Sequence, residues 1–136
     1  MADAVTSQTI LDGDRLYIAK FTDISDGSGE SAVTKINVSS LAANQFGLAC
    51  NGVIINKIWA MTDGMGVNIL WDATADVIAV TIPQNEMYTM SFQEFGGIQN
   101  NSGAGKNGNV LFTTTGASAG DRYTIVLECI KTYASA

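Results

Sequence analysis

The sequence predicts an all-β protein, a single-domain antiparallel β-sandwich that is jelly-roll-like and has eight to nine short strands. Three observations support this fold class. Apolar residues recur with a period of two instead of 3.6. β-Branched and aromatic residues dominate the periodic segments. Turn-forming glycine and aspartate residues separate these segments at short intervals, as in sandwiches and barrels.

Eight segments carry the strand pattern: residues 16–21, 32–38, 52–61, 67–71, 77–82, 87–92, 110–114 and 123–131. In the third segment, Val53, Ile55, Trp59 and Met61 are expected to share one face, because side chains alternate along a strand. Folding is expected to bury Leu16, Ile18, Ile55, Trp59, Trp71, Ile125 and Leu127.

The 136 residues suit one domain covering residues 1–136. Residues 1–11 precede the first clear turn, and we interpret them as an N-terminal arm. This arm either extends to add a strand to a neighbour or packs back on its own core. The longest irregular stretch, residues 96–109, is expected to be a surface loop, either functional or an unremarkable tip.

Composition excludes several function classes. The net charge is -6, and the seven Lys and Arg residues are scattered singly, so neither nucleic acid nor an anionic membrane is an expected partner. No apolar run is long enough to span a bilayer, and residues 1–15 lack the features of a signal peptide, so we expect synthesis in the cytoplasm.

Motifs for catalysis or cofactor binding are weak throughout. Histidine is absent, which removes the commonest general base and metal ligand. Residues 103–106 resemble the end of a P-loop, but the flanking residues do not fit it. We therefore expect no enzyme activity, no catalytic residues, no cofactor and no metal site. The alternatives that loop carboxylates such as Asp12 and Asp14 combine to hold an ion, or that Asp72 and Asp76 act as a glycosidase pair, stay open.

The two cysteines, Cys50 and Cys129, lack a neighbour at the spacing of a zinc or redox motif. Cys129 follows the alternating pattern of its strand, which places it toward the core. In a reducing compartment, two buried free thiols are favoured over a disulfide.

Several segments resemble small structural proteins of tailed bacteriophages, notably those of aquatic bacteria. The most specific of these segments are FTDISDGSGESAV and NNSGAGKNGNVLFTT, and the resemblance extends over almost the whole chain. It implies a virion structural protein, of the head decoration or cement type. Such a protein would be made in the host cytoplasm and would lie on the capsid surface, where it stabilises the head by bridging neighbouring capsid proteins.

This resemblance implies the major capsid protein as a partner and, by analogy with other decoration proteins, a homotrimer. The segment 77–82 is apolar on both faces, which also indicates a subunit interface. We expect partner contacts at Val5 and Ile10 in the arm and at Phe95 and Ile98 in the loop. The alternative is a tail or fibre component with a receptor- or carbohydrate-binding role.

Overall fold

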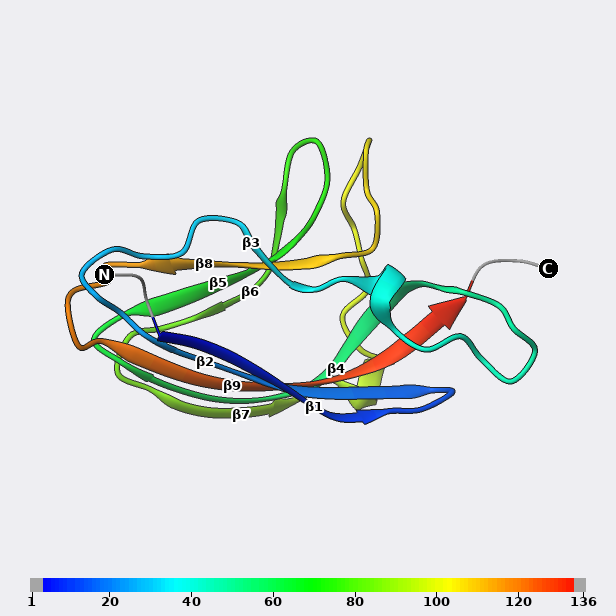
Figure 1. The fold of residues 1–136 in the computed structure, drawn as a ribbon, viewed down its shortest axis with the longest axis horizontal. Coiled ribbons are helices and arrows are strands. Elements are labelled where there is room, and N and C mark those ends of the chain that lie inside the picture. Colours follow the sequence, from blue (N-terminus) through cyan, green and yellow to red (C-terminus); the bar gives the residue numbers. More distant parts are fainter. Residues whose placement is uncertain (1–3, 134–136) are drawn as a thin grey trace.

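The computed structural model describes residues 4–133 and shows two antiparallel β-sheets packed face to face (Figure 1). In chain order the elements are β1 (Ala4–Asp12), β2 (Leu16–Ile24), β3 (Val33–Ile36), the 3₁₀ turn η1 (Val38–Ser40), β4 (Cys50–Asp63), β5 (Gly66–Trp71), β6 (Val77–Ile82), β7 (Met87–Ser91), the 3₁₀ turn η2 (Gln93–Phe95), β8 (Val110–Thr115) and β9 (Arg122–Tyr133). The expected all-β sandwich is confirmed.

The strand order is that of a jelly roll. One sheet has the order β1-β2-β9-β4-β7, and the other has the order β3-β8-β5-β6. Only the β1–β2 and β5–β6 pairs are hairpins within one sheet, and every other connection crosses to the opposite sheet. Without β1, four strands remain in each sheet, which is the eight-strand jelly-roll arrangement. The strand β1 is therefore an addition at one edge.

The core lies between the two sheets and is built around aromatic rings. Phe112 of β8 packs edge-to-face against Phe21 of β2 and Tyr123 of β9, with ring centroids 5.5 and 5.7 Å apart. Trp71 of β5 is fully buried beside them in the same core. Such rings bury large apolar areas, and their edge-to-face packing adds a further ~0.5–1.5 kcal/mol per pair.

A buried polar cluster joins the two sheets. Lys35 Nζ lies 2.5 Å from Glu30 Oε2, and both side chains are only 5% exposed. The Tyr123 hydroxyl donates to the other carboxylate oxygen of Glu30 at 2.5 Å. Because buried charges are tolerated only when they are paired and hydrogen-bonded, this cluster fixes the position of the segment that leads into β3.

All eight expected strands are present, with ends that shift by a few residues. The segment 77–82 coincides with β6, whereas the segment 32–38 contains only the four-residue strand β3. The ninth strand, β1, lies in the region that we interpreted as an arm. Its residues pair with β2 of the same chain instead of leaving the sandwich.

The expected common face of Val53, Ile55, Trp59 and Met61 is wrong, and a β-bulge is the reason. The register of β4 against β9 shifts between Ile55 and Lys57, so Asn56 is an extra residue. Beyond the bulge, Ile58 and Ala60 point inward and are buried. Trp59 is therefore half-buried on the outer face, and Met61 is 50% exposed there.

The expected burial is confirmed for Ile55, Trp71, Ile125 and Leu127 but is wrong for three residues. Trp59 is displaced by the bulge, and Leu16 and Ile18 lie half-buried on the outer face of β2. The inward residues of β2 are Tyr17, Ala19 and Phe21. Because β2 is apolar on both faces, alternation alone does not show which face meets the core.

Candidate interaction surfaces

The strand β1 is an exposed edge strand of unusual composition. It is nine residues long, contains no proline and carries no charge before Asp12 at its end. The side chains of Val5 and Ile10 are 45% and 53% exposed. Natural sheet edges are usually kept short, charged or bulged, because an open edge offers unpaired backbone groups to other chains. Of these three protective features, β1 has only a bulge, which is the register shift at Ile10.

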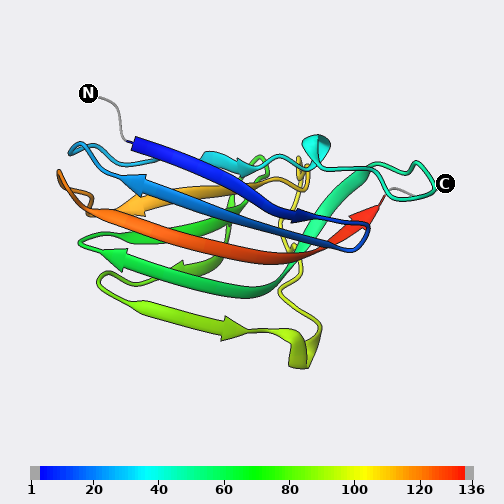
Figure 2. The same cartoon turned by 60° about the horizontal axis from the view of Figure 1, so that its bottom comes forward.

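Both faces of β1 are exposed, because the opposite sheet does not extend beneath it. Ser7 pairs with Phe21 and Thr9 pairs with Ala19, so both share the inward face of the sheet, yet both are exposed. Figure 2 shows β1 along the outer edge of the five-stranded sheet. Its attachment therefore includes the backbone ladder to β2, the contact between the Thr6 and Thr22 hydroxyls, a side-chain hydrogen bond between Thr9 and Tyr17, and the turn that follows.

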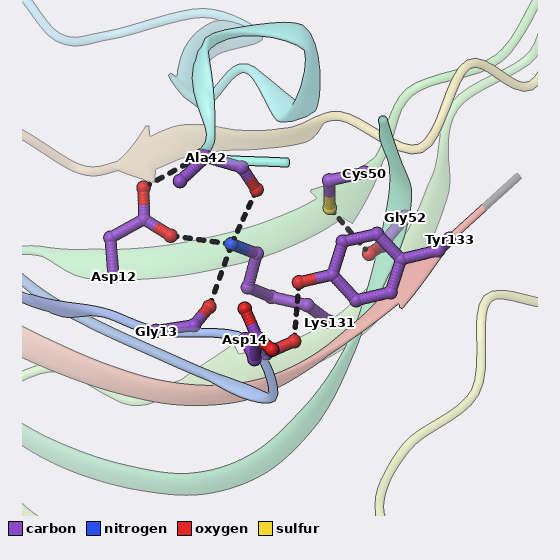
Figure 3. Close-up of polar contacts among 8 residues, drawn as sticks. All are labelled: Asp12, Gly13, Asp14, Ala42, Cys50, Gly52, Lys131 and Tyr133. Carbon is purple, nitrogen blue, oxygen red and sulfur yellow. Dashed lines mark hydrogen bonds and ion pairs between the residues drawn. The ribbon is translucent and has the colours of Figure 1, made fainter. Parts of the chain in front are cut away.

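The turn after β1 is fixed by a buried lysine (Figure 3). The side chain of Lys131, in β9, is 0% exposed. Its Nζ donates to Asp12 Oδ1 at 2.6 Å, to the Gly13 carbonyl at 2.9 Å and to the Ala42 carbonyl at 2.8 Å. The second oxygen of Asp12 accepts from the Ala42 N–H at 2.9 Å. One ammonium group thus joins β9, the β1–β2 turn and the segment before β4.

The protonated state of Lys131 is favoured despite its burial. Burial lowers the pKa of the ammonium, but the hydrogen bonds and charges of Asp12 and Tyr133 raise it more, so the pKa lies above its ordinary value of 10.5. Tyr133 itself donates to the Asp14 carbonyl on the other side of the turn (Figure 3). The carboxylate of Asp12 is therefore one partner of an ion pair within the fold, and the other partner is Lys131.

The two expected contact residues of the loop have different environments. Phe95, in η2, is 68% exposed, with its ring centroid 6.0 Å from that of Phe92. Ile98 is half-buried and exchanges two backbone hydrogen bonds with Ile55 of β4, at 3.1 and 2.8 Å. Ile98 thus packs on its own core, whereas Phe95 is open to contact.

The expected contact residues do not form one patch. Val5 and Ile10 lie on β1, at one edge of the five-stranded sheet, and Phe95 follows β7, at the opposite edge (Figure 2). Two separate apolar contacts at opposite edges allow one subunit to touch two neighbours.

An apolar groove lies on the outer face of the five-stranded sheet. This groove was not predicted from the sequence. Its volume is about 320 Å³, and its lining includes Trp59, Met61, Met87, Tyr88, Thr124 and Val126. Lys57 Nζ lies 5.1 Å from the centroid of the Trp59 ring. The bulge at Asn56 places Trp59 here, and the sequence shows only an asparagine within an otherwise apolar strand at this point.

A larger, polar pocket lies where the loop 96–109 meets β4 and β9. Its volume is about 540 Å³, and it is lined by Asn51, Gly52, Val53, Ile54, Gln99, Asn100, Lys106, Asn107, Gly108 and Thr132. Four of its six polar lining side chains are amides. The length and composition of this segment predicted a surface loop. Its contact with the ends of two strands was not predicted.

The carboxylates considered as ion ligands or catalytic pairs have local structural contacts. Asp26 accepts from the backbone and hydroxyl of Ser28, and Asp76 accepts from the Ala73 N–H. Asp72 accepts from the Asn107 side chain. Within residues 4–133, no group of three or more His, Cys, Asp or Glu side chains is placed to hold a metal ion.

Both cysteines are free and buried. Burial is the main cause that raises the pKa of the Cys129 thiol, and the nearby charge of Glu128 adds to it. The Cys50 thiol donates to the Gly52 carbonyl at 3.2 Å. Enclosed thiols of this kind act as packing groups.

Comparison with known proteins gives no assignment: no family model matches the chain, and no curated protein matches it. None of the helices in the described part of the chain is long and apolar enough to cross a membrane.

Proposed function

We propose that this chain is a structural virion protein, a capsid decoration or cement subunit that stabilises a phage head by bridging neighbouring capsid proteins. The observation that carries the proposal is β1, an edge strand that is exposed on both faces and carries no charge before Asp12 at its end. Jelly rolls are frequent among viral capsid proteins, and this adds support by analogy of fold. The resemblance to phage structural proteins supports the same role.

Strand addition is the form of contact that suits β1. Its inner edge is paired with β2, and its outer edge is open to a strand of another protein. Main-chain hydrogen bonds would supply the affinity, and Val5 and Ile10 would supply apolar area and register. The fixed turn at Lys131 holds the strand in place before binding, which lowers the entropy cost of docking.

A second contact at the opposite edge makes bridging feasible. Phe95 and the exposed Met87 of β7 offer apolar area there, at 68% and 79% exposure. Each contact alone would be modest, but many copies on one shell would add their effects through multivalency.

We further propose that the subunit forms a closed homotrimer. Ile78, at the edge of the four-stranded sheet, is 53% exposed, while Val80 and Ile82 of the same strand are buried. An exposed β-branched residue on an uncharged edge strand suits a contact that is repeated by rotation. Light scattering on the purified chain should give three times the mass of one chain, and a stable monomer at high concentration would refute the trimer.

Binding to particles tests the decoration role directly. Capsids purified without this protein are mixed with the wild-type chain, with a chain lacking residues 2–9, or with Ile10→Lys, and are then sedimented. The deletion keeps all eight jelly-roll strands, so the fold should survive. A lysine in the open edge should oppose strand addition. Both variants should bind at least tenfold more weakly.

The matched control is Thr34→Lys, which places the same charge at an exposed position of β3, an edge strand of the other sheet that takes part in neither proposed contact. It should bind capsids as the wild type does, and all variants should keep the wild-type circular dichroism spectrum. If the shortened chain and Ile10→Lys decorate capsids with undiminished affinity, β1 is not the anchor.

The alternative role, a tail or fibre component with receptor or carbohydrate binding, is favoured by one observation, the polar pocket beside the loop 96–109. A purely structural subunit has no need of a concave polar site. Mass spectrometry of separated heads and tails would distinguish the two positions in the particle.

A further inference from the structure

The polar pocket is built from three parts of the chain that the fold holds together. Residues 51–54 come from the start of β4, Thr132 comes from the end of β9, and the remaining lining residues come from the loop 96–109. Since β4 and β9 pair along their whole length, this wall of the pocket is as rigid as the sheet.

The loop wall is also fixed, although it has no regular secondary structure. At its start Ile98 forms a bridge with Ile55, and near its end the Asn109 carbonyl accepts from the Asp72 N–H at 3.1 Å. The Thr74 N–H donates to the Ala104 carbonyl at 3.0 Å, so the β5–β6 loop supports the middle. Figure 1 shows these two loops rising side by side above the four-stranded sheet. The pocket is therefore formed before any ligand arrives.

A glycine sets the close approach of loop and sheet. Gly108 is buried and has a φ of +85°, and a Cβ at this position would lie 2.2 Å from the Asn51 carbonyl oxygen. Any other residue would push the loop away from β4 and widen the pocket. Residue 108 thus fixes the distance between the two walls.

The lining offers hydrogen-bond donors that the fold does not use. Asn51 Oδ1 accepts from the Thr132 hydroxyl at 2.7 Å, and Asn100 Oδ1 accepts from the backbone and hydroxyl of Ser102. Within residues 4–133, neither amide NH₂ group makes a hydrogen bond. Gln99 makes only a long one, at 3.5 Å, to its own loop. A ligand would find several amide donors and one ammonium group, that of Lys106, while the oxygen of the Thr132 hydroxyl can still accept a hydrogen bond.

Charge and shape restrict the ligand class. The one charged lining residue is Lys106, in a protein of net charge -6, so an anion would gain one favourable contact against an unfavourable overall field. The lining also contains the half-buried Ile54 and two glycines, which add apolar surface to the amides. A neutral ligand with many hydroxyl groups and one apolar face matches this combination.

We infer that this pocket binds a neutral saccharide of one or two rings. Sugar hydroxyls both donate and accept, so they pair with the amides of Asn51, Gln99 and Asn100 and with the Thr132 hydroxyl. The C–H face of the ring would lie against Ile54. The volume of about 540 Å³ lies within the usual range of small-molecule sites. The inference holds whether the subunit sits on the head or on the tail, because it depends on this pocket alone.

Titration followed by NMR tests the inference with defined probes. The ¹⁵N-labelled chain is titrated to about 50 mM with glucose, galactose, mannose, N-acetylglucosamine, maltose and lactose, and separately with inorganic phosphate. At least one sugar should shift the amide signals of Asn51, Gln99 and Asn100 with saturation, at millimolar affinity, as expected for a few exposed hydrogen bonds.

Two variants locate the binding, and a third controls for general effects. Asn51→Ala and Gln99→Ala remove amides that contribute little to the fold, and each should weaken sugar binding at least fivefold. Gln93→Ala removes an exposed amide in η2, outside the pocket lining, and should leave binding unchanged. The inference is overturned if no sugar shifts the lining signals, if phosphate alone does so, or if both pocket variants bind as the wild type does.

Discussion

Lys131 is the residue whose environment departs most from what its chemistry prefers. A lysine ammonium is strongly hydrated, yet here it is enclosed and pairs with one carboxylate and two carbonyl groups. Because it connects the β1–β2 turn to β9, its contribution should appear both in the stability of the sandwich and in the position of β1.

Replacing this lysine should destabilise the protein strongly. Lys131→Met keeps the apolar stem but leaves the Gly13 and Ala42 carbonyls without their donor and Asp12 without its counter-ion. Loss of one partner of a buried pair typically costs about 3–5 kcal/mol. Urea unfolding should show a decrease of this order in the free energy of unfolding. Lys20→Met, on the half-exposed outer face of β2, should change it by less than ~0.5 kcal/mol.

The pH dependence of stability should identify the same group. The pKa of Lys131 is raised in the folded protein, so its contribution is fully present below the unfolded pKa of 10.5. It is lost as the pH rises through the higher folded-state value. The wild type should therefore lose stability above about pH 10.5 more steeply than Lys131→Met. Equal alkaline slopes in the two proteins would show that the lysine is not held as an ion pair.

At the level of elements, alternation of apolar residues is enough to predict the strands, because a two-layer sandwich imposes a period of two. Alternation fails to predict which face is buried where the hydrogen-bonded pairing of neighbouring strands is irregular. The bulge at Asn56 is fixed by contacts distant in sequence: Asn56 Nδ2 donates to Glu128 Oε2 at 2.6 Å, and its carbonyl accepts from Phe92 N–H at 2.8 Å. Neither contact is visible in the local pattern, so the outward position of Trp59 could not be predicted.

The strand β1 was missed for a different reason. Its residues show no buried face, because all but the last are exposed, and so the sequence carries little apolar alternation. Its pairing with β2 depends on backbone hydrogen bonds, which any sequence can form. Of the four residues expected to contact partners, Val5, Ile10 and Phe95 are exposed, and Ile98 is half-buried because its backbone completes a bridge to β4.

The two tryptophans give a direct test of the β4 register. Trp59 lies half-buried in the outer groove, and Trp71 is fully buried in the core. Acrylamide should therefore quench part of the wild-type fluorescence, and Trp59→Phe should remove that part and leave a blue-shifted, protected emission. If Trp59→Phe leaves quenching unchanged, Trp59 faces the core and the bulge is misplaced.

At the scale of the whole molecule, the sandwich consists of an eight-strand jelly roll with one strand added at its edge. The core explains stability without β1, since the inward face of that strand contacts no opposing sheet. A nine-residue strand that contributes so little to its own core is best explained by a role in contact with another protein. The polar pocket lies in a separate part of the fold and would serve a different ligand.

The central claim is that the subunit decorates a phage head through the open edge of β1, and cryo-electron microscopy of the intact particle tests it most directly. We predict that the sandwich fits density on the outer surface of the capsid, with the edge of β1 paired to a strand of a neighbouring protein. Density for the chain in the tail, or on the capsid with β1 facing solvent, would contradict the account.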